Sequence, residues 1–119
     1  MKNTRDLPLT PEMFELIAKR FRLLGEPLRL RLLHVLESGE HSVGEMSLAL
    51  GSNQPNVSRH LAALLHGGLL NRRREGTTIY YSIADPAVFQ LCELVCQSAI
   101  DQMHARLSAM GKRAKAGRG

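Results

Sequence analysis

The stretch NQPNVSRHLAALL, residues 53–65, places hydrogen-bonding side chains at one end of a predicted helix and apolar side chains at the other. The amides of Gln and Asn can pair with adenine through two hydrogen bonds, and a guanidinium can pair with guanine in the same way. A helix N-terminus also attracts phosphate. The candidate base-contacting residues are therefore Gln54, Asn56, Ser58, Arg59 and His60. The alternative is that these side chains are simply solvated beside a buried helix end.

Cys92 and Cys96 form a second candidate site. Residues four apart share one face of an α-helix, so the two thiols are expected close together. Two thiolates could bind one soft metal or metalloid ion, because sulfur ligands select such ions. They could equally sense reactive sulfur or oxidants, or pack in an apolar core as small hydrophobic side chains.

The elements that position the first group are predicted from caps and apolar spacing. Thr10-Pro11 begins a first helix, and a second opens at Pro27. Ser42, followed three residues later by Glu45, predicts a capping box and a third helix. Asn53 caps a fourth helix that ends at two glycines. Two helices joined by a short glycine-containing turn are typical of a helix-turn-helix, whose second helix presents its N-terminal residues to base edges in the major groove.

A β-hairpin is predicted next. LLNRRR and TTIYYSI flank the turn signal Glu75-Gly76, which makes the helix-turn-helix winged. Neighbouring strand residues point to opposite faces, so the successive arginines cannot all follow one phosphate track. We expect Arg73 or Arg74, with Thr77, on the DNA backbone, and one residue of the pair Tyr80 and Tyr81 in the core. Arg29 and Arg31 are expected at the surface or in an interface, and a helix near DNA could use Arg29.

A long helix is predicted from Pro86, capped by Asp85, to about Met110. A helix of about 25 residues spans roughly 37 Å, about the width of a small domain. Apolar residues recur along its whole length, so a second copy of the chain is expected to cover them. They are Val88, Leu91, Val95, Ala99, Met103 and Leu107.

Length and charge set the broad class. A chain of 119 residues is one ordinary domain, and its net charge of +5 and pI of about 9.8 favour polyanions such as nucleic acid. No apolar run is long enough to span a membrane and no secretory signal core is present, which predicts a cytoplasmic protein with reduced cysteines. No catalytic motif is found, so an enzyme is not expected.

The predicted organisation is a flexible arm over residues 1–9, a winged helix-turn-helix domain with dimerisation helices over 10–110, and a disordered basic tail over 111–119. The fold class is mainly α with a β-hairpin wing and a long C-terminal dimerisation helix.

Four segments together resemble the ArsR/SmtB-type winged-helix repressors: LLGEPLRLRLLHVLESGE, LGSNQPNVSRHLAAL, GGLLNRRREGTTIYYSI and the long final helix. The resemblance covers roughly residues 14 to 100. It implies a homodimer that represses an operon by binding a double-stranded DNA operator and often releases it when an effector binds. It also implies that the first and last helices form the dimer interface.

The sequence departs from this family at its metal sites. Ser42-Val43-Gly44 stands where the family has its Cys-Val-Cys thiolates, so that site is absent. The positions matching the zinc site of the last helix are Asp85, Ala87, Ser98 and Asp101, and two carboxylates alone are a poor zinc site.

Cys92 and Cys96 therefore remain the only candidate effector ligands. A trivalent arsenical, preferably a monosubstituted one, leads the possible effectors, partly through the resemblance. Other soft metals follow, and sensing of reactive sulfur or oxidants, or structural cysteines with no effector, are the alternatives. A protein–protein adaptor with an incidental basic face is the alternative outside DNA binding.

Overall fold

The computed structural model describes the backbone of residues 8–117 and the side chains of residues 8–112. The chain divides into two compact units, one ending at Asp85 and one beginning at Pro86. Most of the arm expected over residues 1–9 lies outside the described residues.

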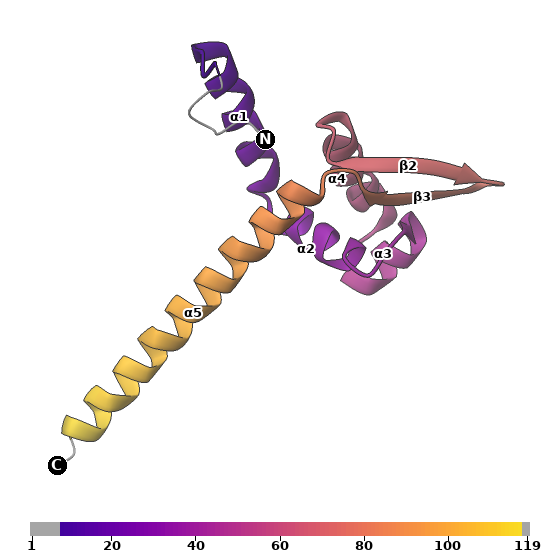
Figure 1. Ribbon diagram of the computed structural model, residues 1–119. Helices are drawn as coiled ribbons and strands as arrows, with labels where there is room; N and C mark the ends of the chain where they lie inside the picture. Colours follow the sequence, from indigo (N-terminus) through magenta and orange to yellow (C-terminus); the bar gives the residue numbers. More distant parts are fainter. Residues whose placement is uncertain (1–7, 118–119) are drawn as a thin grey trace. The chain divides into compact units, whose positions relative to one another are not determined.

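The first unit is mainly helical with a small antiparallel sheet, which confirms the predicted fold class. Its elements in chain order are α1 (Pro11–Leu24), α2 (Pro27–Leu36), β1 (His41–Ser42), α3 (Val43–Leu50), α4 (Gln54–His66), β2 (Leu70–Glu75) and β3 (Thr78–Ile83). The strands lie in the order β1-β3-β2, and β2 and β3 form a hairpin that extends away from the helices (Figure 1). The sequence did not predict β1, because two residues are too short to show an alternating pattern.

Three of the predicted caps, Thr10, Ser42 and Asn53, are confirmed and explain where three helices begin. Thr10 accepts a hydrogen bond from the Met13 amide at 3.2 Å at the start of α1. Ser42 and Glu45 form the reciprocal capping box of α3, with distances of 3.1 and 3.3 Å. Asn53 accepts from the Asn56 amide at 2.8 Å and starts α4. Each cap satisfies a backbone donor that the first helical turn leaves without a partner.

The turn between α3 and α4 depends on Gly51. Its φ of 63° lies in the left-handed region, where a side chain would be strained. Three residues, 51–53, then join the two helices. This tight connection confirms the predicted helix-turn-helix.

One face of α4 holds it in the core. Val57, Leu61 and Leu64 are fully buried. Complete burial of such a side chain stabilises a fold by about 1.5–3 kcal/mol. The same core contains Leu32 of α2, Met46 of α3 and Leu69 before the hairpin. These contacts fix which face of α4 is left for solvent or a ligand.

The second unit is one continuous helix, α5 (Pro86–Gly117), of 32 residues (Figure 1). It begins at Pro86, as predicted, but continues beyond Met110 through residues predicted to be a disordered tail. Lys, Arg and Ala favour helix, no proline interrupts the segment, and the one glycine inside it, Gly111, costs only about 1 kcal/mol because Gly117 is the last residue of the helix. Large apolar side chains are exposed along α5: Leu91, Leu94, Val95, Ile100, Met103, Leu107 and Met110.

Among the described residues, no helix combines the length and the hydropathy needed to cross a membrane.

Candidate nucleic-acid interface

The first turns of α4 present a polar face to solvent. Gln54, Ser58 and Arg59 are exposed, whereas the neighbouring Val57 is buried. The spacing of these residues places them along one side of the helix, opposite the core face. The structure thus brings three of the five predicted base-contacting residues together on an accessible surface beside the turn from α3.

Asn56 is half-buried and already hydrogen-bonded on both sides of its amide. Its Nδ2 donates to Ser52 Oγ at 3.1 Å, and its Oδ1 accepts from Arg59 Nη2 at 2.8 Å. In this arrangement Asn56 holds the guanidinium of Arg59 rather than offering a free amide edge. Its observed contacts are therefore those of a residue that positions Arg59.

His60 lies on the core side of α4, unlike the other four predicted residues. It is only 7% exposed, and its Nδ1 accepts a hydrogen bond from Arg29 Nε at 3.0 Å. His60 directly precedes the buried Leu61 and follows Val57 by three residues, which turns its side chain inward. Burial, followed by the charges of Arg59 and Arg29, lowers the pKa of His60. In this structure His60 is not placed to reach a base edge.

Arg73, in the middle of the wing, is held by carboxylates. Its Nε and Nη2 donate to the two oxygens of Glu40 at 2.7 and 2.6 Å, and its Nη1 donates to Glu75 at 3.0 Å. The guanidinium also lies 4.6 Å from the centre of the Tyr80 ring. The hydrogen bond from Arg73 lowers the pKa of Glu40, and the hydrogen bonds that Arg73 donates to Glu40 and Glu75 raise its own pKa.

The other wing arginines point the opposite way. Arg72 and Arg74 pair in register with Tyr81 and Ile79, so their side chains lie on the opposite face of the hairpin from Arg73. Both arginines are exposed, and so is Thr77 in the turn. Of the two cationic candidates, Arg73 is paired with carboxylates, whereas Arg74 forms no ion pair among the described residues. Tyr81 is buried, which confirms that one of the two tyrosines belongs to the core.

Cys92 and Cys96 are both free thiols on α5. Cys92 is half-buried and Cys96 is exposed. Burial, followed by the charge of Cys96, raises the pKa of Cys92. Within the described residues, no group of three or more His, Cys, Asp or Glu side chains could hold a metal ion. The donor set is thus two sulfurs, which fits a soft, two-coordinate ion and does not fit a tetrahedral zinc site.

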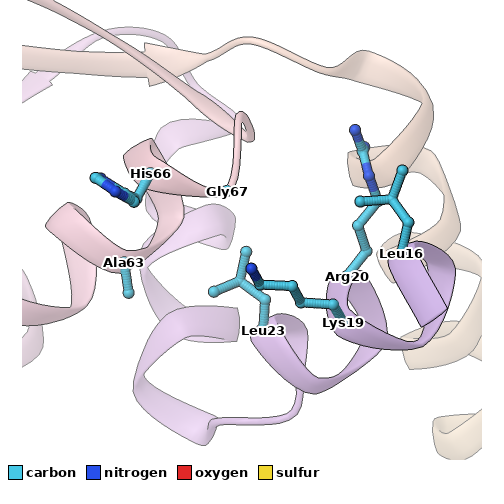
Figure 2. Close-up of a pocket in the computed structure, with 7 residues that line it drawn as sticks. All are labelled: Leu16, Lys19, Arg20, Leu23, Ala63, His66 and Gly67. Atoms are coloured by element: carbon cyan, nitrogen blue, oxygen red, sulfur yellow. The ribbon is translucent and has the colours of Figure 1, made fainter. Parts of the chain in front are cut away.

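A cavity of about 230 Å³ lies between α1 and the last turn of α4. Figure 2 shows Lys19 and Leu23 of α1 extending toward Ala63 and Gly67 of α4. A Cβ at Gly67 would collide with the side chain of Leu23, so this glycine permits the close approach of the two helices.

The sequence did not predict the partners of two residues. Arg29, expected at the surface or in an interface, is part-buried and contacts α1 and α4, and nothing in the local pattern around residue 29 marks those contacts. Glu40 lies 33 residues before Arg73, and their pairing follows only from the fold.

The comparisons with known proteins agree with this geometry. The model of the arsR family of bacterial regulatory proteins matches residues 26–72. A probable mercury resistance operon repressor from Streptomyces lividans is 36% identical over 102 residues, which are 86% of this chain and 80% of that protein.

Two solved structures have a fold similar to that of this chain over most of its length. The homodimeric winged helix-turn-helix DNA-binding domain of Mb0332 from Mycobacterium bovis has a TM-score of 0.71 at 34% identity, over 85% of this chain and 92% of that one. The transcriptional repressor BigR from Xylella fastidiosa has a TM-score of 0.65 at 31% identity, over 71% of this chain and 86% of that one.

Proposed function

The chain belongs to the arsR family of bacterial regulatory proteins, and from this membership we propose that it represses transcription as a homodimer bound to an inverted-repeat operator, until a thiol-binding effector releases it. The observation that carries the DNA-binding part is the exposed polar face at the N-terminal half of α4. Gln54, Ser58 and Arg59 stand there beside a tight helix-turn-helix turn. Side chains at this place in such a motif reach base edges in the major groove.

The roles of the contacting residues differ. Gln54 and Arg59 would read base edges, with Asn56 fixing the direction of Arg59. Arg74 and Thr77 of the wing would bind phosphate and fix the register of the protein on DNA without reading sequence. Arg73 would act through its contacts with Glu40 and Tyr80, which lie at the middle of the wing.

A homodimer is supported by the apolar surface of α5 and by the dimeric state of the Mycobacterium bovis domain. Exposed leucine, isoleucine, valine and methionine side chains along a helix of 32 residues are costly in water. A two-fold dimer would cover them and would present two α4 helices to successive major grooves. An inverted-repeat operator follows from that symmetry.

Cys92 and Cys96 are the proposed effector site. Two sulfurs on one helix face suit Hg²⁺ or a monosubstituted trivalent arsenical, and the Streptomyces lividans relative is named for mercury resistance. Such an ion would supply a bridge between the two thiolates. It would release DNA only by binding the DNA-free conformation more tightly than the DNA-bound one.

The test is a fluorescence-anisotropy titration of the reduced protein on DNA from upstream of its own gene. Tight binding that weakens steeply with salt is expected, because phosphate contacts release counterions. Hg²⁺ and phenylarsine oxide are then added to the complex, with a Cys92→Ser/Cys96→Ser variant in parallel. Release in the native protein alone would support the effector site. Equal release in both proteins, or none, would remove it while leaving DNA binding in place.

A further inference from the structure

Arg29 of α2 joins two other helices through one guanidinium. Its Nη1 donates to the backbone oxygen of Leu23 in the last turn of α1, at 3.1 Å. Its Nε donates to Nδ1 of His60 in the middle of α4, at 3.0 Å. The guanidinium is planar and rigid, so two bonds from one group fix the directions of both partners.

We propose that Arg29 and the neutral imidazole of His60 form a positioning contact that holds α4 in its DNA-reading orientation relative to α1. The proposal rests on the DNA-binding function proposed above and deepens it. His60 acts as an acceptor inside the protein, and Arg29 acts through His60.

The contact requires one particular form of the histidine ring. The Nε–H of arginine is always a donor, so Nδ1 of His60 must carry a lone pair and the ring proton must be on Nε2. Protonation of Nδ1 removes the acceptor and places two cations together. Because His60 is buried, water cannot readily take the place of the lost bond.

The charges around His60 come from two helices. Arg29 lies on α2, Arg59 precedes His60 on α4, and Glu26 is the residue that caps α2. Burial and the two arginines favour the neutral ring, whereas Glu26 opposes them, and the result is a pKa below the ordinary value of 6.5. The contact is therefore intact above pH 6.5 and is lost as the pH falls through the lowered pKa.

A second contact ties the same two helices together. The side chain of Leu23 packs so closely on Gly67, at the C-terminal end of α4, that a Cβ there would require the leucine side chain to move (Figure 2). Leu23 thus contacts α4 directly through its side chain, and indirectly through the hydrogen bond that its backbone oxygen accepts from Arg29. These two contacts hold α4 at its middle and at its C-terminal end. A shift of His60 would therefore also move Arg59, the exposed residue next to it.

Three substitutions test separately the hydrogen-bond acceptor of His60 and the positive charge of Arg29. His60→Asn keeps an acceptor oxygen near the position of Nδ1 but cannot be protonated. His60→Leu has a similar size but no acceptor, and it leaves Nε of Arg29 unpaired. Arg29→Lys keeps the positive charge but loses the two-pronged geometry. His66→Asn is the matched control, because His66 is an exposed histidine on the same helix.

DNA affinity is measured by anisotropy at pH 7.5 and at a series of lower pH values, with the thermal transition of each variant recorded in the same buffers. At pH 7.5 we expect Arg29→Lys and His60→Leu to bind the operator about tenfold more weakly, as the loss of one buried hydrogen bond would cause. His60→Asn should stay within about twofold of the native protein. Below the pH at which the NMR titration shows the His60 ring to protonate, the native protein and His66→Asn should weaken, whereas His60→Asn should change little.

A matching readout on the free protein keeps the contact separate from DNA binding. Imidazole ¹⁵N and ¹³C NMR should show His60 with its proton on Nε2, and Arg29→Lys should alter its titration. Two results would overturn the positioning role: His60→Asn with the pH dependence of the native protein, or Arg29→Lys with native affinity. If the native protein bound no DNA, the proposed function would fail as well, whereas the ring spectrum would still report the contact itself.

Discussion

Arg59 and Asn56, one helical turn apart on α4, are joined by a hydrogen bond of 2.8 Å from Nη2 to Oδ1. The amide of Asn56 is itself fixed by Ser52 at 3.1 Å. A long, flexible side chain at the protein surface is thereby held in place before any ligand arrives. Such preorganisation reduces the entropy lost on binding and improves affinity without adding a contact.

Asn56→Ala should weaken operator binding by about tenfold, or about 1.4 kcal/mol, because Arg59 loses its acceptor. Anisotropy titration at constant salt measures the change. Gln90→Ala on α5 is the control, since it removes an exposed amide far along the sequence from α4. Native affinity for Asn56→Ala would show that the orientation of Arg59 does not matter.

Glu40→Gln should strengthen binding to DNA of any sequence. The substitution removes the carboxylate that holds Arg73 at 2.6 and 2.7 Å, so Glu75 is left as the carboxylate partner of Arg73 and two of the guanidinium nitrogens become available to phosphate. The slope of log K against log salt should become steeper by about one unit.

The matched control for this experiment is Glu37→Gln, which removes the same charge from a nearby carboxylate that pairs with His34 instead of an arginine. If both variants gained the same affinity, the effect would come from net charge, and the release of Arg73 would be refuted.

Glu45→Gln should lower the melting temperature more at pH 6 than at pH 3. The hydrogen bonds from His41 and Ser42 lower the pKa of Glu45 below its ordinary value of 4.5 in the folded state. A lowered carboxyl pKa gives stability that is present above the unfolded value and lost as the pH falls through the folded one. Glu15→Gln, on the exposed face of α1, serves as the control in the same calorimetric series. A difference at pH 3 as large as that at pH 6 would contradict this assignment.

Cys96 should react with iodoacetamide before Cys92 at pH 7.5. Thiolate is the reacting form, and burial together with the charge of Cys96 raises the pKa of Cys92. Mass spectrometry after brief alkylation gives the order. Cys96→Ser should speed the modification of Cys92, because it removes a neighbouring negative charge. Faster modification of Cys92 in the native protein would contradict the placement of the two thiols.

Much of the fold was predictable because it is encoded locally. Thr10, Ser42 and Asn53 begin their helices as capping chemistry requires, and the hairpin turns at Gly76 and Thr77, directly after Glu75. The C-terminal end of α5 could not be predicted, because its lysine, arginine and alanine residues suit a helix as well as a solvated tail.

The site was predictable only in part, since burial and long-range pairing do not show in a local pattern. A polar residue near the start of α4 can face either side of the helix, and His60 faces the core. The partner of Arg73 lies 33 residues earlier in the chain and that of His60 lies 31 residues earlier. The exposed positions of Gln54, Ser58 and Arg59 agree with the helical periodicity from which they were predicted.

The most direct test of sequence-specific binding by α4 compares the native protein with Gln54→Ala/Arg59→Ala on two duplexes, the operator and a scrambled sequence of the same composition, at one salt concentration. We predict that the double variant loses most of its preference for the operator, by about 1–3 kcal/mol per lost base contact, and keeps most of its affinity for the scrambled duplex. An unchanged ratio of the two affinities would show that α4 does not read the bases and would contradict the account.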